Sequence, residues 1–154
     1  RIRRGIYRLR DYPSWPREEV MAAWLAAGKD RAVVSHESAL DLLDLSDVIP
    51  NYIHLTVPRT VRHLPKLPGV AFHTTTRELQ RKDVTYREGI RLTSPVRTIL
   101  DAAEWGTGPE QIEMAVRQAI RRGLTTRGVF EEAVKERSER VRKLVLGAMA
   151  PVRR

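Results

Sequence analysis

Hydrophobic residues recur at helical spacing near the start of this chain and through its last third. Residues 18–27 mix apolar and acidic side chains and stop at Gly28, which predicts a first helix. A second helix is predicted from His36 to about Asp44, with Ser35 as its N-cap. Four further helices, each opened by a serine, threonine or proline, are predicted to start near Ser94, Pro109, Thr126 and Ser138.

The middle of the chain has a different pattern, with short runs of β-branched and aromatic residues. These runs predict strands at 52–57, 70–73, 83–87 and 90–93, the last two joined by a tight turn at Glu88-Gly89. The expected fold is α+β: a small mixed or antiparallel sheet with N-terminal helices and a C-terminal helical bundle.

The first ten residues alternate arginine with Ile2, Ile6, Tyr7 and Leu9 around Gly5. This pattern predicts a ribbon with one apolar and one guanidinium face, suited to the wing of a winged helix. A basic edge strand or a solvated tail is the alternative. The chain starts without Met inside this element, so we expect most of a DNA-binding domain to precede it. The expected division is a wing remnant at 1–12 and a larger domain at 13–154.

Composition and charge narrow the class of protein. The 154 residues are 42% hydrophobic and 31% charged, which is typical of a globular protein. The absence of cysteine excludes disulfides, a thiol nucleophile and cysteine-based zinc sites. No apolar run approaches the ~20 residues that span a bilayer, so a cytoplasmic protein without a membrane partner is expected. The net charge of +9 is uneven, with residues 18–50 acidic and the flanking segments basic, which favours a polyanionic partner.

A second basic group follows the strongest predicted strand. It contains Arg59, Arg62, His63 and Lys66 on a loop, where binding residues often collect, although a solvated surface loop is the simpler alternative. By contrast, Arg121-Arg122 lies in the last turn of a predicted helix, where the helix dipole already favours cations. The candidate DNA-binding residues are Arg1, Arg3, Arg4, Arg8, Arg10, Arg59, Arg62 and Lys66.

The histidines and serines do not predict a reactive centre. Neighbouring residues of a starting helix point in different directions, so Ser35 is interpreted as a cap and not as a nucleophile paired with His36. The four histidines lack metal-binding spacing, and no metal is predicted, although His54 and His73 lie on strands that could be neighbours.

Other motifs of catalysis are also missing from the sequence. Arg97 and Asp101, spaced i, i+4, are expected to form a structural pair. Gly106-Thr107-Gly108 lacks the remaining glycine and lysine of a phosphate-binding loop, and Asp83 beside Lys82 lacks the second carboxylate of a nuclease site. No catalytic residue or cofactor is predicted.

Four strings, in this order, resemble one known family. They are Arg4–Leu9, Ser35–Leu40, Ile53–Arg59 and Leu92–Asp101, with a weaker fifth at Ala119–Leu124. The set is similar to the AbiEi family, the antitoxins of type IV toxin–antitoxin systems, which are also transcriptional regulators. The resemblance covers nearly the whole chain.

The resemblance implies a function that composition does not show. Family members have an N-terminal winged helix-turn-helix that binds operator DNA and a C-terminal domain linked to neutralising a nucleotidyltransferase-like toxin. The expected function is therefore a non-enzymatic antitoxin and autorepressor, with operator DNA and a cognate toxin as partners. This chain departs from the pattern because no recognition helix precedes the wing. The alternatives are a toxin-modifying enzyme, such as an atypical kinase, and a protein-interaction module without DNA binding.

Overall fold

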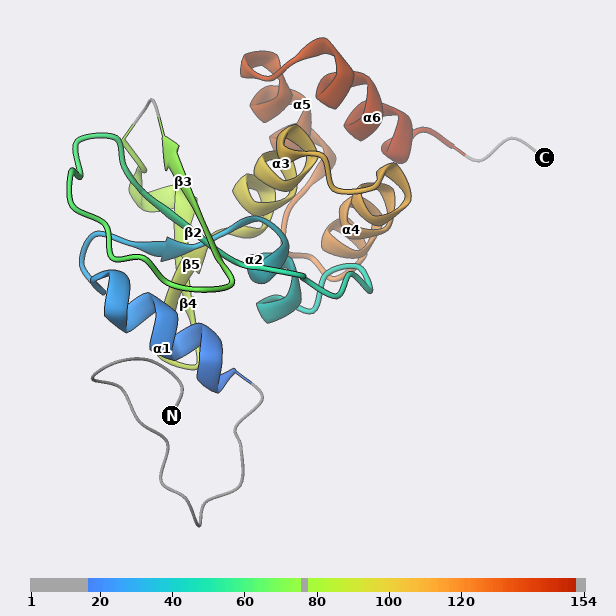
Figure 1. The fold of residues 1–154 in the computed structure, drawn as a ribbon. Helices are drawn as coiled ribbons and strands as arrows, with labels where there is room; N and C mark the ends of the chain where they lie inside the picture. Colours follow the sequence, from blue (N-terminus) through green and yellow to red (C-terminus); the bar gives the residue numbers. More distant parts are fainter. Residues whose placement is uncertain (1–16, 76–77, 152–154) are drawn as a thin grey trace.

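The computed structural model describes residues 17–75 and 78–151 and shows the expected α+β fold (Figure 1). Its α-helices are α1 (Glu18–Ala27), α2 (His36–Leu42), α3 (Pro95–Trp105), α4 (Pro109–Arg121), α5 (Arg127–Ala133) and α6 (Glu139–Met149). Its strands are β1 (Val33–Val34), β2 (Ile53–Pro58), β3 (Val70–Thr75), β4 (Val84–Arg87) and β5 (Ile90–Thr93). No helix in the described ranges is long and apolar enough to cross a membrane.

The strands form one mixed sheet in the order β3-β2-β1-β5-β4. The β2–β3 and β1–β5 pairs are parallel, whereas β1–β2 and β4–β5 are antiparallel. The predicted hairpin turn is present, with positive φ at both Glu88 (54°) and Gly89 (80°), as a tight turn matched to strand twist requires. The central strand β1 was not predicted, because two buried valines give no alternating pattern.

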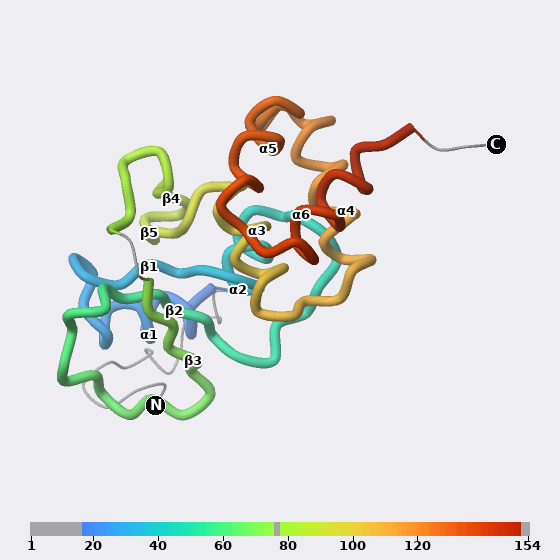
Figure 2. Tube along the Cα trace, turned by 90° about the horizontal axis from the view of Figure 1, so that it is seen from above, coloured from blue at the N-terminus to red at the C-terminus, as the bar shows by residue number. Residues whose placement is uncertain are grey.

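The molecule has two lobes, which Figures 1 and 2 show from perpendicular directions. The sheet and α1 form one lobe, and α3 to α6 form the other. Helix α1 is fastened to the sheet by Trp24, whose Nε1 donates a hydrogen bond to the Ala32 carbonyl at 2.8 Å. Helix α2 packs between the lobes, against β2 on one side and α3 on the other.

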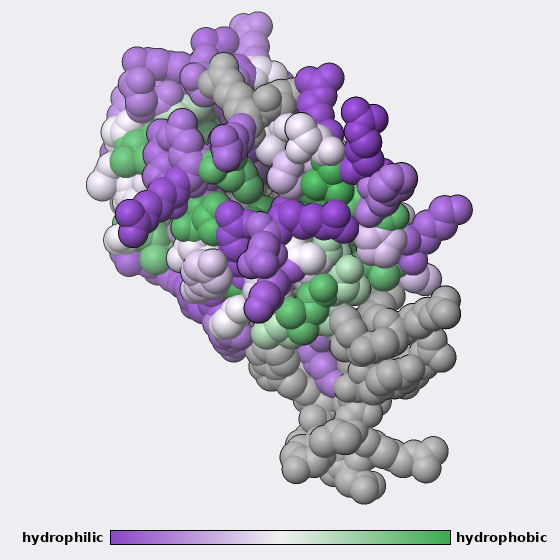
Figure 3. Space-filling view, turned by 90° about the vertical axis from the view of Figure 1, so that its left-hand side faces the viewer, coloured by the Kyte–Doolittle hydropathy of each residue, from purple (hydrophilic) through white to green (hydrophobic). Residues whose placement is uncertain are grey.

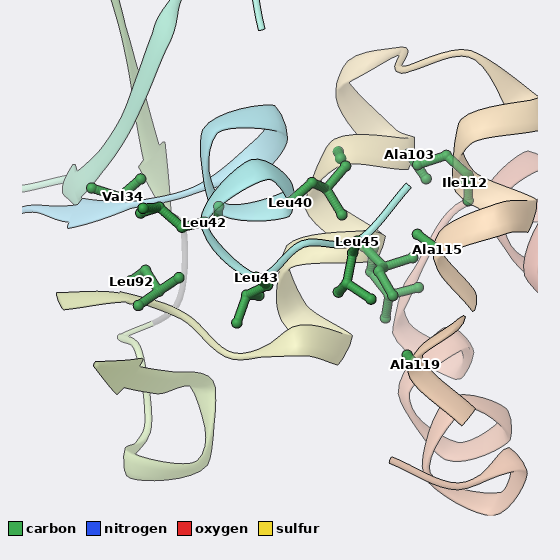
Figure 4. Close-up of a cluster of buried hydrophobic side chains, with 14 of the residues drawn as sticks. Val34, Leu40, Leu42, Leu43, Leu45, Leu92, Ala103, Ile112, Ala115 and Ala119 are labelled. Atoms are coloured by element: carbon green, nitrogen blue, oxygen red, sulfur yellow. The ribbon is translucent and has the colours of Figure 1, made fainter. Parts of the chain in front are cut away.

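One hydrophobic core runs through both lobes (Figure 4). Val34 and Leu92 contribute from neighbouring strands, and Leu40 and Leu45 carry the core towards Ile112 on α4. These side chains are at most 1% exposed. Burial of this continuous apolar stripe stabilises the contact between the sheet and the helical lobe.

The helix ends follow the sequence signals only in part. Thr126 and Ser138 cap α5 and α6 through their side chains, but Ser35 and Ser94 occupy N-cap positions without a capping bond from theirs. Helix α2 stops at Leu42, two residues earlier than predicted. The predicted helix ending at Glu136 continues beyond α5 as a 3₁₀ turn at Val134–Glu136. The predicted ribbon and its domain boundary at residue 12 lie outside the described residues.

Candidate functional site

The first candidate site is the loop of residues 59–69, which joins the parallel strands β2 and β3. Because parallel neighbours start at the same end, this connection must run back along the sheet. Val61 and Leu64 pack against the core, which fixes the loop on the fold. Arg59, Arg62 and Lys66 alternate with these anchors and are exposed.

The electrostatics of this loop are one-sided. The sequence has no aspartate or glutamate between Asp47 and Glu78. Within the described residues, no ion pair involves Arg59, Arg62 or Lys66. The loop lies on the far side of the sheet lobe from α4 and α6 (Figure 1), and Figure 3 shows hydrophilic side chains crossing that side of the molecule.

Of the two predicted basic groups, the structure describes the one on this loop, where Arg59, Arg62 and Lys66 are exposed. The N-terminal arginines, from Arg1 to Arg10, lie outside the described residues. The C-terminal pair divides: Arg122 donates hydrogen bonds to the carbonyls of Leu43 (3.0 Å) and Asp44 (2.9 Å), while Arg121 stays exposed. Arg122 therefore fastens the end of α2 and has a structural role.

The second candidate site is a cluster of three histidines that the sequence did not predict as a metal centre. His36 opens α2, His54 lies on β2 and His73 on β3. His54 Nδ1 lies 2.9 Å from His73 Nε2, and the rings of His36 and His73 stack with centroids 3.7 Å apart. One ring nitrogen from each of the three lies within 4.8 Å of the others.

Local backbone geometry explains how His36 joins this cluster. His36 has a φ of 54°, a left-handed conformation that is uncommon for a residue other than glycine. Its Nδ1 lies 2.7 Å from Ser35 Oγ, which also accepts a hydrogen bond from the Thr56 hydroxyl at 2.7 Å. The prediction that Ser35 and His36 point apart was wrong, because it assumed ordinary helical geometry at His36.

Strand register brings the other two histidines together. In the parallel β2–β3 pair, His73 is the partner of Thr56, and His54 lies two residues before Thr56. Residues two apart on a strand share a face, so the imidazoles of His54 and His73 lie on the same side of the sheet. The prediction that these two strands could be neighbours was correct.

Helix α3 covers the cluster with residues spaced four apart. Trp105 meets the His54 ring edge-on, with centroids 4.6 Å apart. One turn earlier, Asp101 Oδ2 accepts a hydrogen bond from Arg97 Nε at 2.9 Å, which confirms the predicted pair. Asp101 Oδ1 also pairs with Arg137 Nη2 at 2.8 Å. This three-residue ion cluster joins α3 to the segment that precedes α6.

Burial sets the protonation of the histidines. Burial, with His73 and His54 next in importance, lowers the pKa of His36 to about 2. Burial and then His73 lower the pKa of His54 to about 4. Burial also lowers the pKa of His73, against an opposing effect of Asp101. The three imidazoles are therefore neutral at neutral pH, the form that binds metals.

Chemically, the two sites differ. The loop offers exposed cations to a polyanion, whereas the histidine cluster offers neutral nitrogen ligands below the surface. Ser35 is fully buried beside His36, so its hydroxyl is not presented to a substrate. The sequence signal that could have revealed the cluster was the pairing of the strands carrying His54 and His73. Nothing in the sequence indicated the backbone conformation of His36.

Comparison with known proteins adds no family. No protein-family model matches the chain, and no curated protein matches it.

Proposed function

We propose that this chain belongs to a DNA-binding regulator of the antitoxin type, as its resemblance to the AbiEi family implies. The observation that carries the DNA-binding part is the loop of residues 59–69, with three exposed cations free of ion pairs in the described structure. Such side chains suit contacts with phosphates, which position a protein on DNA without reading its sequence.

The loop is suited to an auxiliary role in DNA binding, beside a separate element that recognises the bases. Val61 and Leu64 hold the loop against the core, so its cations project from a fixed support. A loop whose backbone is already held in place loses less conformational freedom on meeting a phosphate than a free tail would. We expect the loop to add affinity for duplex DNA, with base recognition supplied by the helix-turn-helix that the resemblance implies.

The test measures duplex DNA binding by the full chain as a function of salt. The variant Arg59→Ala/Arg62→Ala/Lys66→Ala is compared with wild type by fluorescence anisotropy, using the promoter region of its own operon and an unrelated duplex. Each lost phosphate contact reduces the log–log salt slope by about 0.9, so the triple variant is expected to lose up to about 2.7. The loss is expected on both duplexes, because phosphate contacts do not depend on sequence.

A matched control removes the same charge from the helical lobe. Arg121, Arg127 and Arg142 are exposed on α4, α5 and α6, and Ala at all three changes the net charge equally. This control is expected to keep the wild-type slope. Equal losses in the two triple variants would show that only net charge matters and would refute the role of the loop.

The antitoxin part of the proposal rests on the four ordered strings and has its own test. The chain is co-expressed with a nucleotidyltransferase-like protein encoded beside it, and growth is compared with expression of that protein alone. Restored growth supports the antitoxin function. Unrelieved growth arrest, with both proteins present in soluble form, would contradict it.

A further inference from the structure

The three histidines meet where α2, β2 and β3 converge, at chain positions far apart in the sequence. Two of them are almost fully enclosed: His54 is 0% exposed and His36 is 8% exposed. His73 is half-buried and gives the cluster its side nearest solvent. We propose that His36, His54 and His73 bind one divalent transition-metal ion of the zinc type, each through one ring nitrogen.

The donor set favours this class of ion. Neutral imidazole nitrogens bind Zn²⁺, Co²⁺, Ni²⁺ and Cu²⁺, whereas Mg²⁺ and Ca²⁺ prefer oxygen ligands. Three histidines with a remaining open position form one of the known ligand sets of zinc. A phosphate-like anion would need charged imidazoliums, and burial opposes that charge here.

The contacts of His54 indicate which of its nitrogens is the ligand. Its Nδ1 lies 2.9 Å from His73 Nε2, so these two nitrogens already converge on one point. Its Nε2 is buried and makes no hydrogen bond. Binding of the ion through Nδ1 leaves the proton of the ring on Nε2.

The distances require only small movements. Zinc–nitrogen bonds of about 2.0–2.1 Å in a tetrahedral arrangement separate two ligand nitrogens by about 3.3 Å. The nearest ring nitrogens of His54 and His73, 2.9 Å apart, need to separate by a few tenths of an ångström. The third nitrogen, within 4.8 Å of the others, needs to approach by up to roughly 1.5 Å. Because the His36 and His73 rings now stack, one ring must tilt for its lone pair to converge.

Metal-binding histidines usually donate a hydrogen bond from the nitrogen that does not bind the metal, and a group beside this cluster can accept one. Ser35 Oγ, 2.7 Å from His36 Nδ1, can accept the proton on that nitrogen and so leave the other nitrogen free to bind. The guanidiniums of Arg97 and Arg137 oppose a nearby cation, but both pair with Asp101, and Arg97 also lies 3.9 Å from Asp83. These pairs offset the positive charge beside the cluster.

The experiment titrates the untagged full chain, freed of metal by a chelator, with Zn²⁺ and with Co²⁺. One ion per chain is expected in calorimetry, with the visible bands of tetrahedral Co²⁺. In NMR spectra of the imidazole nitrogens, the signals of three rings shift together. These measurements need no variant. Failure to reach a saturable stoichiometry of one, or shifts confined to the exposed His63, would overturn the proposal.

Two single substitutions add a matched comparison. His73→Gln removes the half-buried ligand and is expected to weaken Zn²⁺ binding by about 100-fold or more, because even supporting residues cost 10–100-fold. His63→Gln removes an exposed histidine of the 59–69 loop and is expected to change nothing. Wild-type affinity in a His73→Gln protein that circular dichroism shows to be folded would refute the site. The triple variant of the loop is expected to bind Zn²⁺ normally, so this proposal and the DNA-binding proposal can fail separately.

Discussion

Asp101 is the position where loss of a single charge should destabilise the fold most clearly. Its side chain is 9% exposed and bridges Arg97 (20% exposed, 2.9 Å) and Arg137 (18% exposed, 2.8 Å). Asp101→Asn preserves shape but removes the negative charge, which leaves two largely buried guanidiniums without their shared partner. Breaking a buried pair in this way costs about 3–5 kcal/mol.

Two details place the expected loss at the lower end of that range. Arg97 keeps Asp83 at 3.9 Å, and both guanidiniums reach some solvent. We therefore expect the free energy of unfolding to fall by about 3 kcal/mol, which lowers Tm by roughly 6–12 °C in a chain of this size. Urea unfolding followed by circular dichroism measures the difference, with the slope of the transition reported for both proteins.

The control is an ion pair of equal length in a different environment. Glu132 and Lys135 also approach to 2.8 Å, but their side chains are 76% and 68% exposed. Glu132→Gln is expected to cause no measurable change, because solvent screens an exposed pair. If Asp101→Asn unfolds like the wild type, or if the two variants lose equal stability, the argument from burial is refuted.

Three further predictions concern histidine burial, helix composition and capping. In metal-free protein the pKa values of His36 (about 2) and His54 (about 4) lie below the unfolded value of 6.5, so the unfolded state binds more protons under acid. The free energy of unfolding is therefore highest above pH 6.5 and falls towards pH 4 by about 1.4 kcal/mol per pH unit per ring. A flat profile of urea midpoints from pH 7 to 5 would contradict this. Gly147 lies inside α6, where an added Cβ would meet open space, so Gly147→Ala should raise stability by about 0.5–1 kcal/mol. Gly106→Ala should lower stability by about 1 kcal/mol, because Gly106 has a φ of 117°. Thermal melts showing the same sign for both would disprove the reasoning. Ser138→Ala removes the hydroxyl that caps α6 and should cost about 1 kcal/mol in chemical denaturation, while Ser138→Thr, which keeps a hydroxyl, should remain close to wild type.

Local sequence signals were sufficient for most elements of this fold. The helix that ends before Gly106 and the hairpin at Glu88-Gly89 were predictable because a cap, a stop or a turn residue marks each boundary. Strand β2 was predictable from its β-branched run. Strand β1 was not, because Val33–Val34 is too short for any periodicity and is defined only by pairing on both sides.

The histidine cluster was beyond such signals for a related reason. His36, His54 and His73 are brought together by strand register and by one left-handed residue, and neither is encoded in a short window of sequence. Metal motifs recognised from spacing place their ligands on one helix or one turn. The cations of the 59–69 loop were predictable as a group because the sequence patterns of the strands on either side, β2 and β3, mark where the loop begins and ends.

The strand order makes the continuity of the sheet depend on two residues, Val33 and Val34. Among the strands of the described residues, only β1 bonds to both the β2–β3 pair and the β4–β5 hairpin, through Val33 and Val34. If Val33 and Val34 lose these bonds, the half of the sheet that carries His54, His73 and the basic loop is no longer hydrogen-bonded to the half that leads into α3. A polar substitution at either valine would therefore be felt across the whole molecule, although neither residue touches a partner or a ligand in any of the proposals above.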